Sequence, residues 1–566
     1  MNGRAHTSWE RPHAVFLAVL LFLLVFFYIP VGHVLVKAFV LDGAFTPRLF
    51  FDTLLSPYTG RIVGFTFLQA ALSTVFSLLL GLPGAYILTM YRFPGRSLVR
   101  STSAVPFVLP PILVVLGFVI FFGNSGFLNR ITMELFDLSR PPLRILYSLK
   151  AIILAHGFYN FPIALRVVSS LWQSLPSTQE WAASTLGARP LRLFRTITLP
   201  QLLPAIYAAS ALIFMFCFTS FAVILVLGGG PEFTTVEVEI YRLARISFDL
   251  HTAAALSIIA VVLTLGLMYV YIRLQGGSSY HQQLTAAGGD SVRAPRKPGP
   301  AARASMTLYS VLVMLVVAGP LLSIIVNSFR KPVSWSGGTV FTLEWYRYIF
   351  GLGSADSTAR YPQIAVEAVA NSLSIGILAA AVAIPVGIAL SYYTVRHAKR
   401  GRGLIDALAM APMTPSSVVL GLGYLLISRT VDPSPRWAPL FIVGAHAVIA
   451  YPFVVRTVSS TLRKISPSQR YAAMLLGSAP GRVFRTVELP LILPSVFAGA
   501  AFAFGISLGE MNATIVLSSS TTTIPLAIYR LIGSYNFYGA CALGTILVLV
   551  SLGVFFLFDT YAETEW

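Results

Sequence analysis

The sequence is poor in charged residues and in cysteine. Only 11% of its 566 residues are Asp, Glu, Lys or Arg, whereas 56% are hydrophobic. This composition leaves too little polar surface to cover a soluble globule of this length, so it predicts a protein embedded in a lipid bilayer. The two cysteines, Cys217 and Cys541, each lie inside an apolar run, which excludes a disulfide framework and a cysteine metal cluster.

Acidic residues are scarcer than basic ones, and the formal net charge is +19. In a soluble protein this excess would suggest nucleic-acid binding. Here the Arg and Lys residues lie mainly in short loops between apolar runs, a pattern typical of membrane topology. We therefore expect membrane lipid, and no nucleic acid, among the partners of this chain.

Motifs that carry chemistry are also missing. The chain has no G-x-x-x-x-G-K-[ST] nucleotide-binding loop. It has no cluster of His, Asp or Glu of the kind that a membrane-embedded enzyme would need. We therefore expect no catalytic residue, no metal site and no cofactor bound by this chain.

Twelve apolar stretches are long enough to cross about 30 Å of hydrocarbon, which takes roughly 20 helical residues. The sequence thus predicts an all-α integral membrane protein with two domains of six helices each, residues 1–275 and 305–566. The Gly-, Pro- and Ala-rich segment 276–304 between them is typical of a flexible linker. The predicted spans are 13–38, 62–90, 99–122, 148–170, 201–227, 252–274, 306–328, 366–394, 405–428, 440–462, 491–518 and 539–559.

Basic residues set the expected orientation. With the N-terminus inside, the linker and alternate loops fall on the cytoplasmic side and carry about 24 of the 40 Lys and Arg residues. We therefore expect both termini in the cytoplasm.

The two halves repeat one another. Residues 155–206 align without a gap with residues 445–496, at an offset of 290, and about 21 of the 52 positions are identical. Further matches pair Pro111 with Pro415 and Tyr241 with Tyr529. Because six helices are an even number, both copies enter the membrane from the same side, and parallel repeats of this kind build a pathway at their interface.

A polar segment follows the fourth span of each half and predicts a rigid cytoplasmic knob. It holds two alanines, a glycine that permits a turn, an Arg-bearing amphipathic stretch, and a proline that opens the next span. We expect two short helices joined at the glycine, the first packed through its alanines. The residues are Ala182, Ala183, Gly187, Arg195 and Pro200 in the first copy, and Ala472, Ala473, Gly477, Arg485 and Pro490 in the second.

These segments, residues 177–200 and 467–490, resemble the EAA coupling loop of permease subunits in binding-protein-dependent ABC importers. Ile197-Thr198-Leu199-Pro200 and Val487-Glu488-Leu489-Pro490 match the end of its pattern. The motif Glu is replaced by Trp181 and Tyr471; Glu180 precedes the first, and Arg470 precedes the second.

The resemblance covers nearly the whole chain and is to permeases with two fused domains, typified by ferric-iron and thiamine importers. Residues 211–241 and 531–552 look particularly like the thiamine permeases. The resemblance implies a multi-pass protein of the bacterial inner membrane without enzymatic activity of its own. The implied partners are two copies of an ABC ATPase subunit, which bind ATP and Mg, and a periplasmic or lipid-anchored substrate-binding protein.

Few ionisable residues lie within the predicted spans. Glu510 is the candidate to meet a cationic substrate in the pathway, together with Asn512 and, in the first half, Thr219; the alternative is a helix-packing role. His156 and His446 occupy equivalent positions, and for them we favour helix packing.

One other class of transporter has parallel six-helix halves, namely the twelve-span secondary transporter of the major facilitator type. That class predicts a charged pathway and no paired Ala-Ala-x3-Gly loops. We keep it as the alternative to the ABC importer permease.

Overall fold

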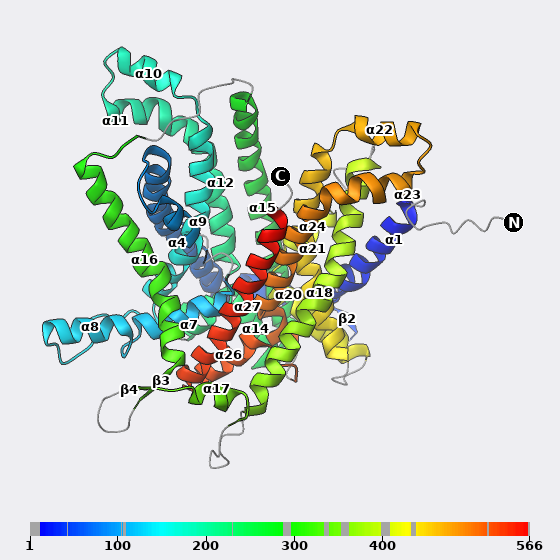
Figure 1. The fold of residues 1–566 in the computed structure, drawn as a ribbon. Coiled ribbons are helices and arrows are strands. Elements are labelled where there is room, and N and C mark those ends of the chain that lie inside the picture. Colours follow the sequence, from blue (N-terminus) through cyan, green and yellow to red (C-terminus); the bar gives the residue numbers. More distant parts are fainter. Residues whose placement is uncertain are drawn as a thin grey trace. The chain divides into compact units, whose positions relative to one another are not determined.

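The computed structural model describes residues 12–41, 43–103, 105, 109–228, 230–286, 296–332, 339–352, 362–397, 408–431, 437–517 and 520–563. These residues are almost entirely helical (Figure 1). Besides the helices there are two short antiparallel hairpins, β1 (Val40–Leu41) with β2 (Ala44–Phe45) and β3 (Arg330–Pro332) with β4 (Thr339–Phe341). The predicted all-α class is confirmed.

The helices of the first half are α1 (Pro12–Leu23), η2 (Leu24–Tyr28), α2 (Ile29–Phe39), α3 (Pro47–Leu55), α4 (Pro57–Met90), α5 (Arg96–Thr102), α7 (Pro111–Phe122), α8 (Phe127–Phe136), α9 (Leu149–Ser174), α10 (Thr178–Thr185), α11 (Pro190–Leu193), η3 (Phe194–Thr198), α12 (Leu199–Phe218), α13 (Ala222–Leu227), η4 (Pro231–Phe233), α14 (Val236–Arg245) and α15 (Leu250–Ala286). Those of the second half are α16 (Pro300–Ser328), α17 (Glu344–Ile349), α18 (Pro362–Arg396), η5 (Ala411–Met413), α20 (Ser417–Val431), α21 (Ala438–Lys464), α22 (Pro467–Leu475), α23 (Pro480–Val483), η7 (Phe484–Glu488), α24 (Leu489–Gly509), α25 (Asn512–Leu517), α26 (Ile524–Gly533) and α27 (Phe537–Glu563).

Within the described residues, eleven helices are long and apolar enough to cross a membrane. They correspond to eleven of the twelve predicted spans. The twelfth predicted span, 405–428, corresponds to the shorter apolar helix α20, and residues 398–407 lie outside the described part.

Three predicted spans are interrupted. The span predicted at 99–122 begins only at Pro111, after a separate helix α5, because Pro110 and Pro111 lack the N–H groups that helix continuation needs and Pro111 disfavours a helical conformation at Pro110. The spans predicted at 201–227 and 491–518 each break near their C-terminal end, between α12 and α13 and between α24 and α25.

The chain forms two compact units that exchange their first spans. Unit 1 comprises residues 1–54, 240–258 and 328–566, and unit 2 comprises residues 55–239 and 259–327. In unit 1 the Tyr424 hydroxyl of α20 donates to the Phe26 carbonyl, 2.5 Å away. In unit 2 the Tyr309 hydroxyl of α16 donates to the Leu80 carbonyl, 3.1 Å away. Each half of the sequence thus contributes its first span to the unit built mainly from the other half, while the domain bounds 1–275 and 305–566 stay a prediction.

Small residues let equivalent helices approach closely in both units. A Cβ at Gly81 would lie 2.8 Å from the Phe161 carbonyl, where α4 crosses α9. A Cβ at Gly387 would lie 2.6 Å from Val454, where α18 crosses α21. Such contacts are typical of membrane helix packing. They place α18 in register with α4 at an offset of 306 residues (387 less 81).

A second contact supports this register. The Val236 backbone N–H donates to Thr66 Oγ1 at 3.2 Å, and the Ile524 N–H donates to Ser372 Oγ at 2.8 Å. Thr66 and Ser372 are also 306 residues apart. The repeat is therefore visible in tertiary contacts as well as in sequence.

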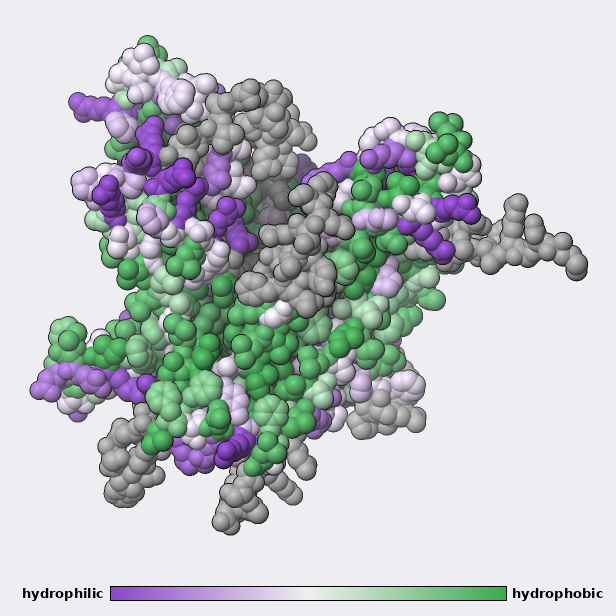
Figure 2. Space-filling model, in the orientation of Figure 1, coloured by the Kyte–Doolittle hydropathy of each residue, from purple (hydrophilic) through white to green (hydrophobic). Residues whose placement is uncertain are grey.

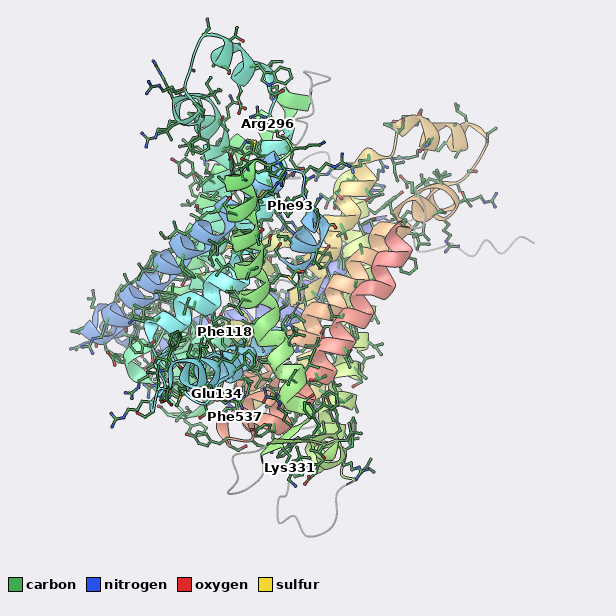
Figure 3. The ribbon with its side chains drawn as sticks, turned by 60° about the vertical axis from the view of Figure 1, so that its left-hand side comes forward. Phe93, Phe118, Glu134, Arg296, Lys331 and Phe537 are labelled. Carbon is green, nitrogen blue, oxygen red and sulfur yellow. The ribbon has the colours of Figure 1, made fainter. Side chains whose placement is uncertain are left out.

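In unit 2, the segment that begins α16 is joined by its backbone to the end of α4. The Arg296 N–H donates to the Met90 carbonyl at 2.8 Å, and the Arg296 carbonyl accepts from the Arg92 N–H at 3.0 Å. Figure 3 labels Arg296 together with Phe93. Part of the predicted linker 276–304 is thus bonded to the end of a membrane helix.

Candidate functional site: the two coupling loops

The first coupling loop, residues 177–200, consists of α10, a turn at Gly187, the short helix α11 and the π-helical stretch η3 that leads into α12 (Figure 1). Gly187 has a φ of 82°, in the left-handed region that glycine adopts without steric cost. The Gly187 N–H donates to the Ser184 carbonyl, and the Ala188 N–H to the Ala183 carbonyl, each at 3.0 Å. This pair of bonds is a Schellman motif, which satisfies the last carbonyls of a helix.

The second coupling loop, residues 467–490, repeats this geometry with α22, α23 and η7. Gly477 also has a φ of 82°. Its N–H donates to the Met474 carbonyl at 3.0 Å, and the Ser478 N–H donates to the Ala473 carbonyl at 3.1 Å. The predicted helix–glycine–helix arrangement is therefore present in both copies.

The outer faces of the two loops expose matched apolar side chains. Trp181 is 60% exposed and its equivalent Tyr471 is 59% exposed. Leu186, next to the glycine, is 88% exposed and its equivalent Leu476 is 87% exposed. Figure 2 shows apolar residues at the far end of the α22–α23 loop within a polar surface. Large apolar side chains held this far out by a rigid turn are typical of a protein-binding surface.

Not every predicted contact in the loops occurs. Ala183 and Ala473 are half-buried, but Ala182 and Ala472 are exposed, so the prediction that both alanines pack the first helix is wrong for one of each pair. Since residues 182 and 183 are adjacent on a helix, they point about 100° apart and cannot share one face. Glu180 and Arg470 are half-buried. Four other predicted loop residues are exposed, namely Arg195, Pro200, Arg485 and Pro490.

The inner side of the first loop is fastened by a carboxylate. Thr198 Oγ1, at the end of η3, donates to Glu180 Oε1 of α10 at 2.7 Å. Next to it, Gln201 Nε2 donates to Gln179 Oε1, also at 2.7 Å. Glu180 therefore points toward the start of α12, while Trp181 in the motif position faces outward.

The inner side of the second loop is fastened differently. Glu488, the equivalent of Thr198, is fully buried, and its Oε1 lies 2.9 Å from Nε of Arg396 at the end of α18. Arg396 Nη2 also donates to the Leu462 carbonyl near the end of α21, at 3.2 Å. In the sequence Glu488 is only a residue of the terminal Leu-Pro pattern and Arg396 only a loop cation. The only sign of this contact in the sequence was that the second copy has Glu488 where the first copy has Thr198.

The breaks in the fifth spans hold the three predicted pathway residues. Thr219 ends α12, and its Oγ1 donates to the Met215 carbonyl at 3.0 Å. Glu510 follows α24, and its Oε1 accepts from the Ala513 N–H of α25 at 2.9 Å. Asn512 Nδ2 donates to Ser417 Oγ of α20 at 3.0 Å. Thr219 and Glu510 thus each mark the interruption of the fifth span in their own repeat.

The two equivalent histidines are buried and bonded to hydroxyl groups. His446 Nδ1 lies 2.8 Å from Ser507 Oγ before the break, and Nε2 lies 3.0 Å from Thr514 Oγ1 after it. His446 therefore bridges the interruption between α24 and α25. These bonds agree with the helix-packing interpretation.

His156 makes the corresponding contacts in the other unit. Its Nε2 lies 2.8 Å from Ser220 Oγ in the break after α12, and its Nδ1 lies 3.1 Å from Ser73 Oγ of α4. Both histidines therefore hold the broken fifth span of their own repeat, although the second contact of His156 is to α4.

Tyr241 and Tyr529, matched in the sequence repeat, meet each other in unit 1. Their phenol groups form a hydrogen bond between α14 and α26. Equivalent residues of the sequence repeat therefore contact one another within unit 1.

The family model of the binding-protein-dependent transport system inner membrane component matches residues 73–277 and 383–563. These two matches cover more than half of the chain and contain both coupling loops. The chain belongs to this family. It is an integral inner-membrane permease of the ABC importer class, and the major facilitator alternative is set aside.

Two curated relatives match almost the whole length of the chain. The chain is 29% identical over 533 residues to the thiamine transport system permease protein ThiP of Brucella abortus (strain 2308), covering 92% of this chain and 91% of that protein. It is 24% identical to the ferric transport system permease protein FbpB of Actinobacillus pleuropneumoniae, covering 95% and 76%. Among solved structures, it is similar to a chain of the bacterial alginate ABC transporter in complex with an alginate-bound periplasmic protein, at 19% identity, a TM-score of 0.39 and coverage of 48% and 94%.

Permeases of this family are not themselves enzymes. In the described residues no three His, Cys, Asp or Glu side chains come together as a group that could hold a metal ion.

Proposed function

We propose that this chain is the transmembrane permease subunit of an ATP-driven importer for thiamine, with ferric iron as the second candidate substrate. The observation that carries the proposal is the pair of coupling loops with matched outer faces in one chain. Thiamine is favoured because the thiamine permease of Brucella abortus matches almost the whole of this chain and is more similar to it, at 29% identity, than the ferric permease of Actinobacillus pleuropneumoniae, at 24%.

Two copies of one ABC ATPase subunit would bind the two loops. Support comes from the equal exposure of Trp181 and Tyr471 and of Leu186 and Leu476, because identical partners require equivalent surfaces. ATP and Mg would be held by those subunits. Closure of the ATPases would move both loops and switch the bundle between outward and inward access.

The loops must then face the cytoplasm, and so must both termini. The excess of basic residues on that side supports this orientation. A periplasmic or lipid-anchored binding protein would deliver the substrate to the opposite face of the bacterial inner membrane.

Glu510 is the proposed contact for a cationic substrate, with Asn512 and Thr219 as neighbouring pathway residues. Its carboxylate lies at a break in a membrane helix, where transporters commonly bind their substrates. Glu510→Gln is expected to raise the KM for thiamine uptake while leaving ATPase binding unchanged. An unchanged KM would assign Glu510 only to capping α25.

Co-purification tests the proposed function. The protein solubilised from its native membrane should carry an ATPase subunit in a ratio of two per permease. Gly187→Val and Gly477→Val should each reduce that ratio, whereas Gly60→Val is the control, because Gly60 lies in α4 with open space around its Cα and without a positive φ. A permease that never binds an ATPase would refute the proposal.

Uptake by the reconstituted complex tests the substrate. Vesicles with the binding protein outside and ATP inside should take up thiamine, and ferric ion should be the weaker substrate. Uptake driven by an ion gradient without ATP would contradict an ABC importer. ATP-dependent uptake of ferric ion alone would keep the importer and replace the substrate.

A further inference from the structure

The two coupling loops are joined to their helices by different chemistry. In the second loop, Glu488 connects three elements through Arg396: it ends η7, while Arg396 ends α18 and donates to the Leu462 carbonyl of α21. The side chains of Arg396 and Glu488 are 10% and 0% exposed. Two opposite charges at 2.9 Å with almost no water around them cannot be separated cheaply.

Neighbouring side chains enclose this ion pair. Tyr392, one turn before Arg396 on α18, lies within electrostatic reach of the Glu488 carboxylate and of Arg470. The Tyr392 ring packs edge-on against Phe484 of η7, with their centroids 4.9 Å apart. The ion pair is therefore set in a packed contact between the loop and α18.

The first loop has other residues at the two positions equivalent to this ion pair. The position equivalent to Glu488 is Thr198, at an offset of 290, and the position equivalent to Arg396 is Met90, at the structural offset of 306. The carboxylate there comes from Glu180 within the loop itself and accepts from a neutral hydroxyl. That hydrogen bond joins α10 to the end of η3, directly before α12.

We propose that the Arg396–Glu488 ion pair is the joint that transmits movement of the second coupling loop to α18 and α21. Arg396 and Glu488 are positioning residues: neither touches substrate or nucleotide, and each acts by keeping the loop fixed to the helices it must move. The inference rests on the proposed function, because it assigns the joint to ATP-driven transport. It adds that the two loops of this permease are not mechanically equivalent.

The ratio of substrate taken up to ATP hydrolysed measures this role. The experiment uses the full complex in vesicles, with thiamine or ferric ion, whichever the wild-type complex takes up. Glu488→Gln is expected to lower the ratio about threefold to tenfold, the range typical of broken coupling contacts, while ATPase subunits remain bound. Thr198→Val is the matched variant in the first loop and should lower the ratio less than Glu488→Gln does, because it removes a neutral hydrogen bond and leaves no buried charge unpaired.

A folding defect is separated from a coupling defect by two double variants. Arg396→Gln with Glu488→Gln leaves no unpaired charge, so it should assemble, and its ratio should still fall. Arg396→Glu with Glu488→Arg restores an ion pair and should recover most of the ratio.

Three results have distinct meanings. If the double glutamine variant assembles and keeps the wild-type ratio, the proposal is overturned, because the contact is then only structural. The same holds if Glu488→Gln lowers the yield of complex but not the ratio in the complex that forms. If the wild-type chain binds no ATPase, the proposed function itself fails, and this is seen before any variant is made.

Discussion

The two coupling loops have similar exposed outer faces, but different contacts hold their inner sides to the rest of the protein. Outside, the exposures of Trp181 and Tyr471 and the φ angles of Gly187 and Gly477 are the same within 1% and 1°. Inside, a neutral hydroxyl bonds Glu180 in one copy, and a buried arginine pairs with Glu488 in the other. The repeat has thus kept what a common partner would touch and has changed how each loop is anchored.

The largest difference between the loops is expected when the buried carboxylate of Glu488 is removed from the second joint. Glu488→Ala leaves Arg396 buried without its partner, which typically costs about 3–5 kcal/mol of stability. We expect a large drop in the thermal midpoint of the purified permease. Glu180→Ala in the first loop is the matched control and should lower it far less, since Glu180 is partly exposed to water. Equal drops would show that the two joints are energetically alike.

The outer faces can be tested with Leu186→Ser and Leu476→Ser. Burying a leucine on docking contributes about 1.5–3 kcal/mol, so each change should weaken ATPase binding by roughly tenfold or more. The thermal midpoint of the permease alone should not move, because both side chains are already almost fully exposed.

The two losses of ATPase affinity should also be equal. Titration of purified ATPase onto each variant measures this. A loss at only one loop would mean that the matched surfaces meet unlike partners, and it would contradict two copies of one subunit.

The turns between the short helices should respond equally to substitution. Gly187→Ala and Gly477→Ala each place a side chain in the left-handed region, at a cost of roughly 1–2 kcal/mol. No atom lies within 4 Å of either added Cβ, so the cost comes from the backbone alone. Equal shifts in the thermal midpoint are expected, and Gly505→Ala in α24 serves as the control without a positive φ. A larger shift at one glycine would show that the turns differ despite their common φ.

These turns were predictable from sequence because their cause is local. A glycine after a short helix and before Pro190 or Pro480 needs no distant contact to form a Schellman turn. The broken fifth spans were not predicted, because the polar residues at the breaks, Thr219 with Ser220 and Glu510 with Asn512, are few and the sequence on either side is apolar. The interruptions depend on hydroxyl and carboxylate bonds that form only after packing.

The joint at Glu488 was out of reach for a different reason. Its partner lies 92 residues earlier (488 less 396), at the end of another span, where an arginine is also what membrane topology predicts. An arginine at this position is explained equally by membrane topology and by an ion pair with Glu488. From the sequence we inferred only membrane topology. The exchange of first spans between the two units likewise depends on contacts such as Tyr424 with Phe26, which no local pattern encodes.

The smallest loss of stability is expected for a change at the first joint, where Thr198 bonds to Glu180. This variant gives the most direct comparison of the two joints. Thr198→Val keeps the volume of the side chain but removes the hydroxyl that donates to Glu180. Because water can reach the half-buried carboxylate and replace the lost donor, the cost should be about 1 kcal/mol. The thermal midpoints of the Thr198→Val and Glu488→Ala variants, measured side by side, give the difference in stability between the two joints. A cost for Thr198→Val as large as that for Glu488→Ala would mean that a neutral hydrogen bond fastens the first loop as firmly as the ion pair fastens the second. Charge would then no longer distinguish the loops, and the unequal coupling inferred from it would lose its physical basis.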